Sequence, residues 1–193
     1  MRSLRFVFII SILFFGCAEE PVKESVPELI TKMVLTFTPT SGSPILVSAT
    51  DPDGEGVQNM AAEGAIILQQ NKSYTLSITL FNELADPTSP EHDLTNEVSD
   101  EADEHIFFFA WTNNRFSVPV GDGNLDNRTD AVQYLDKDSA GFPVGLATHW
   151  ETSGMGKGIF RIQLKHQPEI KSAFSSAADG ETDLDLIFDL EVR

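Results

Sequence analysis

Cysteine is nearly absent from this chain, because Cys17 is the single one among 193 residues. Without a second thiol the chain cannot close an internal disulfide or build a metal site from several cysteines. Stability must therefore come from a packed core. If Cys17 is consumed by modification, thiol-dependent catalysis is excluded as well, and the remaining chemistry uses carboxylates, imidazoles and aromatic rings.

Basic residues are also scarce. Thirteen Lys and Arg stand against thirty Asp and Glu, for a formal net charge of −17. Such a chain repels nucleic acid and anionic lipid headgroups, which excludes a nucleic-acid partner. Hydrophobic residues make up 41% of the chain and include fourteen Phe, enough for one packed domain, so global disorder is excluded too.

Long hydrophobic runs are missing apart from one short segment. Residues 6–15 form a run of ten with a single serine, preceded by Arg2 and Arg5 and followed by Gly16-Cys17. A helix that crosses a bilayer needs about 20 residues, so this run is too short to span. A basic start, a short apolar stretch and a small residue before the cleavage point are typical of a secretory signal peptide.

The cysteine at this position resembles the lipobox of bacterial lipoproteins. The resemblance implies that residues 1–16 are removed and that Cys17 carries the lipid (palmitate and related acyl chains) that anchors the protein to a membrane. Ala18, where inner-membrane lipoproteins carry Asp, implies the outer membrane. Glu19-Glu20 resemble the acidic signal that sends Bacteroidetes lipoproteins to the cell surface, and a periplasm-facing protein is the alternative. The other alternative is an ordinary secretory signal followed by an incidental cysteine.

Helix-period segments longer than about two turns are missing as well, which argues against a βαβ architecture. Short strand patterns separated by polar turns recur instead, most clearly over 74–82, where apolar and polar residues alternate. Strands are predicted at 33–38, 45–49, 65–68, 74–82, 106–111, 131–135, 145–152, 158–165 and 184–192.

These eight or nine strands predict an all-β domain, an antiparallel β-sandwich of Ig-like or jelly-roll-like architecture, over residues 32–193. The polar segment 17–31, which includes the lipidated cysteine, is predicted to be a flexible tether. Residues 83–104 carry nine acidic side chains and no Lys or Arg. A short helix around 94–103 fits the sequence, but the dense like charge favours an open, solvated segment.

Two of the four histidines stand at the ends of predicted strands. His105 follows Glu104 at the start of one strand, and His166 follows another, while Glu181 and Asp183 enter the last. Imidazole and carboxylate bind Zn²⁺ or Cu²⁺ at about 2.0–2.2 Å, so these residues predict a metal site if the strand ends adjoin. The alternative is that each imidazole caps a strand edge by hydrogen-bonding to the backbone or to a carboxylate.

A second cation is suggested by a short acidic segment. Asp51, Asp53 and Glu55 occupy the first, third and fifth positions of a segment with Gly56 at the sixth, like the start of a calcium-binding loop. The twelfth position is Ala62, where an EF-hand carries Glu. The alternative is a plain Asp/Gly turn.

Aromatic residues are candidates for a ligand-binding face. Phe107, Phe108 and Phe109 are consecutive, so they project on alternating sides of a strand that is either buried on both faces or meets a ligand on one. Burial is the favoured alternative for these three. Trp111 and Trp150 are the better candidates for ligand-facing aromatics, because Trp is often only partly buried.

Several segments together resemble a family of small Bacteroidetes-type outer-membrane lipoproteins of uncharacterised function. They are 34–39, 80–83, 103–109, 164–168 and 180–186. Members carry loose labels such as type 1 periplasmic binding fold superfamily protein, which the predicted strands do not support, because that fold requires repeated βα units. The resemblance implies no catalytic residues.

Two functions therefore stay open. No GxSxG or comparable nucleophile motif occurs, so the first is a non-enzymatic binding or accessory module of the cell envelope. Its partner would be a small ligand, a metal ion or another envelope protein. The second is a protein that binds a divalent metal, or depends on one, through the His, Glu and Asp residues at the strand ends. Both histidines and an acid within ligand distance would favour the second.

Overall fold

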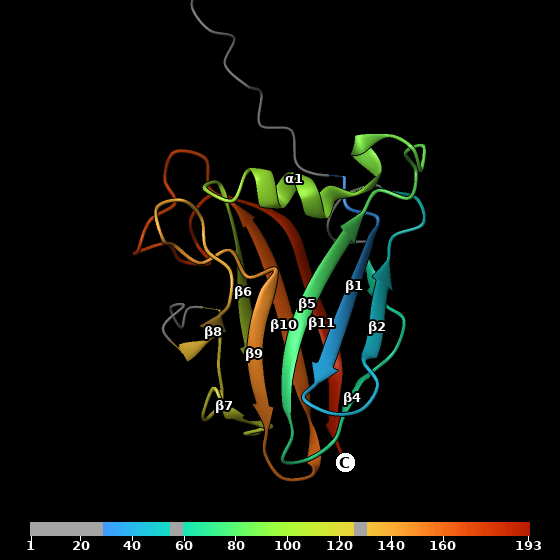
Figure 1. Cartoon of the computed structure of the whole chain (residues 1–193), viewed down its shortest axis with the longest axis vertical. Helices are drawn as coiled ribbons and strands as arrows, with labels where there is room; N and C mark the ends of the chain where they lie inside the picture. Colours follow the sequence, from blue (N-terminus) through green and yellow to red (C-terminus); the bar gives the residue numbers. More distant parts are fainter. Residues whose placement is uncertain (1–28, 55–59, 126–130) are drawn as a thin grey trace, which may run out of the picture.

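The structure is a computed structural model that describes residues 29–54, 60–125 and 131–193. Within these ranges, strands dominate and two short helices interrupt them (Figure 1). The helices are η1 (Pro90–His92) and α1 (Leu94–Asp100). The strands are β1 (Lys32–Pro39), β2 (Ile45–Thr50), β3 (Ala61–Ala62), β4 (Ile66–Leu68), β5 (Ser73–Phe81), β6 (His105–Trp111), β7 (Phe116–Val118), β8 (Gln133–Tyr134), β9 (Ala147–Thr152), β10 (Gly156–His166) and β11 (Glu181–Val192).

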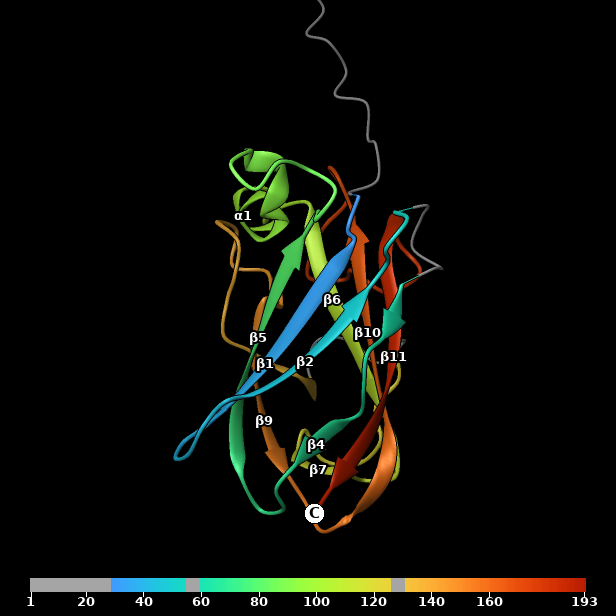
Figure 2. The same ribbon diagram turned by 90° about the vertical axis from the view of Figure 1, so that its right-hand side faces the viewer.

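These strands form two sheets that pack face to face, as the view in Figure 2 shows. The first has the order β3-β2-β1-β5-β9-β7, with β8 also paired to β9, and the second has the order β4-β11-β10-β6. Strand β4 runs parallel to β11, and the other named pairings are antiparallel. The predicted all-β, sandwich-like fold is confirmed.

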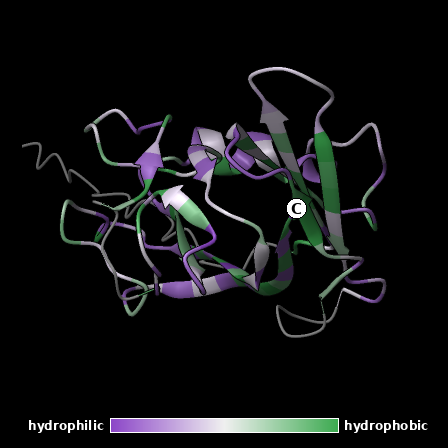
Figure 3. Ribbon diagram, turned by 90° about the horizontal axis from the view of Figure 1, so that it is seen from below, coloured by the Kyte–Doolittle hydropathy of each residue, from purple (hydrophilic) through white to green (hydrophobic). Residues whose placement is uncertain are grey.

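Alternation of apolar and polar side chains explains which face of each strand points inward. In β5 the apolar residues Tyr74, Leu76, Ile78 and Leu80 are buried, and the residues between them are partly or fully exposed. The same period of two appears in β1 and along most of β11. Figure 3 shows apolar and polar residues interleaved along the strands, which is the pattern of sheets with one covered face.

An aromatic cluster fills the space between the sheets. The ring of Phe160 on β10 lies 4.9 Å from Trp150 on β9 and 5.8 Å from Phe116 on β7, measured between centroids. Trp111 lies edge-on to Trp150 at 5.2 Å. Both tryptophans are at most 1% exposed. The prediction that they face a ligand is therefore wrong.

The physical reason is that each indole finds its hydrogen-bond partner inside the fold. Trp111 Nε1 donates to the carbonyl of Gly121 at 2.7 Å, and Trp150 Nε1 donates to Thr148 Oγ1 at 2.8 Å. Because the single polar atom of each side chain is satisfied internally, full burial carries no penalty from an unpaired donor.

Strand β6 is buried on both of its faces. Phe107 and Phe109 point into the space between the sheets, whereas Phe108 joins a second, smaller cluster with Ile106 and Leu125. The structure thus shows the three consecutive phenylalanines buried, which was the favoured alternative.

The acidic segment before β6 is folded and covers one end of the sandwich (Figure 1). Asp93 begins α1 by accepting a hydrogen bond from the amide of Thr95, and Leu94 and Val98 are buried. The expectation of an open, solvated segment is therefore wrong for the residues of α1. Its acids point outward while two apolar residues, one turn apart, pack against the core.

The structure differs from the predicted organisation at the end of the tether and in two short strands. The predicted tether ran to residue 31, but Ile30 and Thr31 are buried, and the Thr31 amide donates to the carbonyl of Phe81. The short strands β3 and β7 were not predicted, because two or three residues show no period in sequence.

In the part of the chain that the structure describes, no helix has the length and apolar character needed to cross a bilayer.

Phe160 is the residue whose truncation should damage the core most clearly. We expect Phe160→Ala to lower the free energy of unfolding by about 3–5 kcal/mol, because it removes a ring that contacts four other aromatic residues. Urea denaturation measures the loss. Phe174→Ala removes the same atoms from a side chain that is 71% exposed, and should change stability by less than about 1 kcal/mol. Equal losses in the two variants would contradict this core.

Candidate metal centre

The candidate site begins with two histidines on neighbouring strands. His105 starts β6 and His166 ends β10, and the antiparallel register places them directly opposite each other. Residues opposite each other share a face of the sheet, so both imidazoles point inward, like Phe107 and Leu164 further along the same strands. The two rings stack at a centroid distance of 4.6 Å with an angle of 9° between their planes.

Both imidazoles lie at the covered end of the sandwich. His105 is 0% exposed and His166 is 7% exposed. Gln167 helps to close the loop that follows, because its side-chain amide donates to the carbonyls of Ser176 and Asp179. Gly180 brings that loop back against β10, since a Cβ there would lie 2.1 Å from the His166 carbonyl oxygen.

Glu101 supplies a carboxylate from the C-terminal end of α1. The Glu101 carbonyl accepts hydrogen bonds from the backbone amide of His105 at 3.2 Å and from its ring Nδ1 at 3.1 Å. Because a carbonyl only accepts, Nδ1 carries the proton, and in the neutral ring Nε2 carries the lone pair. Metal-binding histidines commonly show this arrangement, with the second ring nitrogen donating to a backbone carbonyl.

The three side chains offer a compact set of ligand atoms. One atom each from Glu101, His105 and His166 lie within 4.8 Å of one another. Tetrahedral ligands at about 2.1 Å from a zinc ion are about 3.4 Å apart, so small side-chain rotations would close the site around an ion. These three residues therefore fit a transition-metal ion in number, type and spacing.

Glu104 orients the second histidine. Its carboxylate lies 3.0 Å from His166 Nε2, and its carbonyl accepts the Gln167 amide at 2.6 Å. A carboxylate acceptor places the proton on Nε2 and leaves Nδ1 of the neutral ring as the lone-pair nitrogen. Glu104 thus acts on His166 as the Glu101 carbonyl acts on His105, in the carboxylate–histidine arrangement of many metal sites.

Asp183 adds a buried carboxyl beside His105. A bulge between Leu164 and Lys165 shifts the register with β11, so that Asp183 and Leu184 are both buried. Asp183 Oδ2 lies 3.9 Å from His105 Nε2, and neither carboxyl oxygen has a hydrogen bond within the described residues. Burial raises the pKa of Asp183 to about 6. A nearby cation would compensate the burial of this charge.

The structure thus brings together four of the five predicted metal-site residues. Glu104, His105, His166 and Asp183 converge, whereas the side chain of Glu181 is exposed although its backbone pairs with His166. Sequence reasoning missed Glu101. Its position four residues before His105, where a short helix ends, is the signal that could have identified it.

The acidic segment predicted to bind calcium folds as a turn. Asp51 Oδ1 accepts the amides of Asp53 at 3.3 Å and Gly54 at 3.0 Å. Glu55 lies outside the described residues, so the calcium site stays a prediction.

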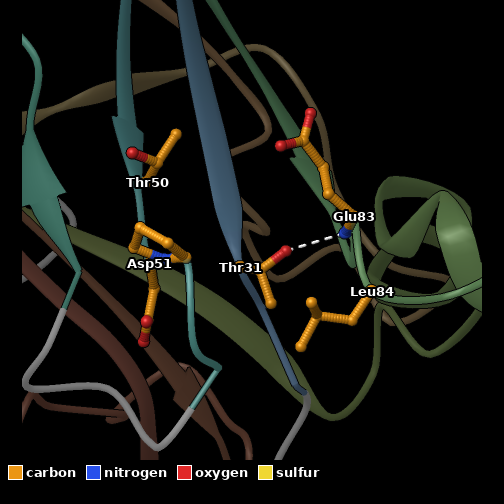
Figure 4. Close-up of a pocket in the computed structure, with 6 residues that line it drawn as sticks. Thr31, Thr50, Asp51, Glu83 and Leu84 are labelled. Carbon is orange, nitrogen blue, oxygen red and sulfur yellow. Dashed lines mark hydrogen bonds between the residues drawn. The ribbon is translucent and has the colours of Figure 1, made fainter.

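A pocket lies beside this turn, near the covered end of the sandwich. It has a volume of about 370 Å³ and is lined by Thr31, Thr50, Asp51, Pro52, Glu83 and Leu84 (Figure 4). Its polar groups already serve the fold: Thr31 Oγ1 accepts the amide of Glu83, and the Glu83 carboxylate pairs with Lys32. Its polar side chains therefore already contribute to the packing between β1 and the segment after β5.

Burial of Asp183 should make stability depend on pH. Its folded pKa of about 6 exceeds the ordinary 3.8, so its contribution is most favourable below about pH 4 and is lost as pH rises through 6. In protein freed of metal by a chelator, we expect Asp183→Asn to raise the free energy of unfolding at pH 7.5 by roughly 1–3 kcal/mol. The gain should shrink toward pH 4, as measured by urea denaturation.

Asp189→Asn is the matched control, because Asp189 lies on the same strand with an exposed side chain. It should leave the pH dependence of stability unchanged. The account of Asp183 fails if Asp183→Asn and the unmodified protein lose stability in parallel between pH 4 and pH 7.5.

Comparison with known proteins found no match: no family model, no curated protein and no solved structure resembles this chain at a significant level. The geometry of the histidine cluster is therefore the basis on which a function can be argued.

Proposed function

We propose that this chain is a lipid-anchored envelope protein whose β-sandwich binds one divalent transition-metal ion, Zn²⁺ or Cu²⁺, through Glu101, His105 and His166. One observation carries the proposal: ligand atoms from these three residues lie within 4.8 Å of one another although the residues span 66 positions of sequence. The buried carboxyl of Asp183 beside His105, whose oxygens make no hydrogen bond within the described residues, supports it.

The chemistry of the ligands argues for a transition metal. Two imidazoles and one carboxylate suit Zn²⁺ and Cu²⁺, whereas Ca²⁺ and Mg²⁺ prefer sites built from oxygen. The rings donate hydrogen bonds to the Glu104 carboxylate and to the Glu101 carbonyl. These bonds fix each ring with its other nitrogen, which carries the lone pair, on the opposite side.

The burial of the site argues for metal binding without catalysis. The two histidines are at most 7% exposed, beneath α1 and the loop over 167–180. A substrate would need an open coordination position that it could reach from solvent, as catalytic zinc sites provide. A closed site suits a protein that holds a metal ion, or passes it to a partner after a local opening.

The N-terminal sequence supports the envelope location. Arg2 and Arg5, the apolar run over 6–15 and Gly16-Cys17 together resemble a lipobox, and Ala18 favours the outer membrane. The described chain begins at residue 29, at the same end of the sandwich as α1 (Figure 1).

Metal titration tests the proposed site directly. We expect metal-depleted protein to bind one equivalent of Zn²⁺ or Cu²⁺ by calorimetry. His105→Ala and His166→Ala should each weaken binding by more than about 100-fold, because loss of an outer-shell partner alone typically costs about 10–100-fold. His149→Ala is the matched control, since His149 pairs with Glu151 on β9 and should leave affinity unchanged. Absence of binding by the unmodified protein would overturn the metal proposal.

Lipid labelling tests the anchor separately. Cells that express the full chain should incorporate labelled palmitate into the protein and retain it in the membrane fraction. Cys17→Ser should abolish the label and release the protein from that fraction, whereas Ser25→Ala should change neither. A Cys17→Ser protein that still sediments with membranes would contradict the anchor without bearing on the metal.

A further inference from the structure

A buried pair of opposite charges, separate from the metal ligands, joins two loops at the covered end of the sandwich. Lys171 follows β10 and Asp138 follows β8, and Lys171 Nζ lies 3.1 Å from Asp138 Oδ2. Each side chain is only 1% exposed. Taking both charges out of water carries a large desolvation cost, which a single contact often fails to recover.

The two oxygens of Asp138 have different environments. Oδ1 accepts backbone amides from Ala140 at 2.9 Å and from Phe142 at 2.8 Å. Oδ2 lies within contact distance of Lys171, but the pair is not aligned as a hydrogen bond, and Oδ2 has no other partner within the described residues. The ammonium instead donates to the carbonyl of Ala102 at 2.5 Å.

This arrangement brings an amine close to a carboxyl carbon. Since a C–O bond is about 1.2 Å long, Nζ lies within about 4.3 Å of the Asp138 carboxyl carbon. Reacting atoms in near-attack geometries are about 3–3.5 Å apart, so a shift of about 1 Å or less is required. Burial also lowers the pKa of Lys171, although the carboxylates of Asp138, Asp136 and Asp103 oppose this effect. A lower pKa raises the fraction of Lys171 that is present as the neutral, nucleophilic amine at a given pH.

We propose that Lys171 and Asp138 condense to form an amide bond between Nζ and the carboxyl carbon, a covalent cross-link within the chain. The C–N bond forms and the bond from carbon to Oδ2 breaks. One of the three ammonium protons stays on the amide nitrogen, and two leave with Oδ2 as water. Atoms and charge balance between the ion pair and the amide plus water, so no oxidant or further reactant is consumed.

The surroundings fit both the reaction and its product. A proton must first pass from Nζ to Oδ2, 3.1 Å away, which leaves a neutral amine and a carboxylic acid. When this amine attacks, negative charge develops on Oδ1, where the amides of Ala140 and Phe142 already donate. After water leaves, Oδ1 is the amide carbonyl and keeps both hydrogen bonds. The remaining N–H faces the Ala102 carbonyl, which already accepts from Nζ. The product therefore replaces two buried charges with a neutral group whose donor and acceptor are both satisfied.

Peptide mass spectrometry of the full-length protein tests the cross-link. Cleavage after Lys and Arg should release a branched peptide that joins residues 138–157 to residues 166–193. The second segment runs past Lys171 because an acylated lysine is not cleaved. The mass of the branched peptide should be one water less than the sum of its two segments, because the condensation releases one water. A majority of molecules in this branched form supports the proposal. A majority of linear peptides 138–157 and 166–171 overturns it.

Two controls separate this bond from an artefact. Lys32 and Glu83 form an ion pair at 2.6 Å whose side chains are 29% and 48% exposed, so their peptides should stay linear in the same digest. Lys171→Arg keeps the positive charge but removes the amine. When the same N-terminal processing is counted for both proteins, the intact mass of that variant should equal the value calculated from its sequence, whereas the unmodified chain should fall one water below its own. A deficit of one water that persists in Lys171→Arg would also overturn the assignment.

Discussion

The pairing of β10 with β6 on one side and with β11 on the other is the constraint on which the rest of the structure depends. Its register turns Phe160, Ile162 and Leu164 toward the first sheet, where they meet the aromatic cluster. The same parity carries on to the end of the strand and turns His166 inward, opposite His105. A shift of one residue would move both the core residues and the histidines to the other face.

At the end of the sandwich that α1 covers, polar side chains occupy buried positions that apolar side chains occupy in its middle. The C-terminal end of α1 helps to accommodate them. Two successive carbonyls at that end, of Glu101 and Ala102, accept hydrogen bonds from the His105 ring and from Lys171. The last carbonyls of a helix have no partner within it and carry partial negative charge, which suits donors of this kind. One short helix thus serves both the proposed metal site and the proposed cross-link.

Periodicity predicted most of the fold because the sheets are long enough to show it. Strand β5 alternates over nine residues, and its buried face follows directly from the sequence. The tryptophans were mispredicted because burial of an indole depends on a partner for Nε1, and the partners of Trp111 and Trp150 are visible only in three dimensions. The dense charge of residues 83–104 concealed Leu94 and Val98, which are enough to hold a helix against the core.

The candidate site was predicted in part for a similar reason. Histidines and acids at strand ends were recognisable, but their convergence depends on register, and the register of β10 with β6 cannot be read from either strand alone. Asp183 is buried by a bulge and Glu101 is positioned by a helix end, and both are local irregularities without a period in the sequence. Glu181, two residues before Asp183 on the same strand, is exposed.

Anomalous X-ray diffraction at the zinc absorption edge, from crystals of the zinc-loaded protein, tests the central claim most directly. The account predicts one ion about 2.0–2.2 Å from a carboxylate oxygen of Glu101 and from one ring nitrogen each of His105 and His166. Zinc bound only to exposed carboxylates, with the two imidazoles still stacked and bonded as they are here, would contradict it.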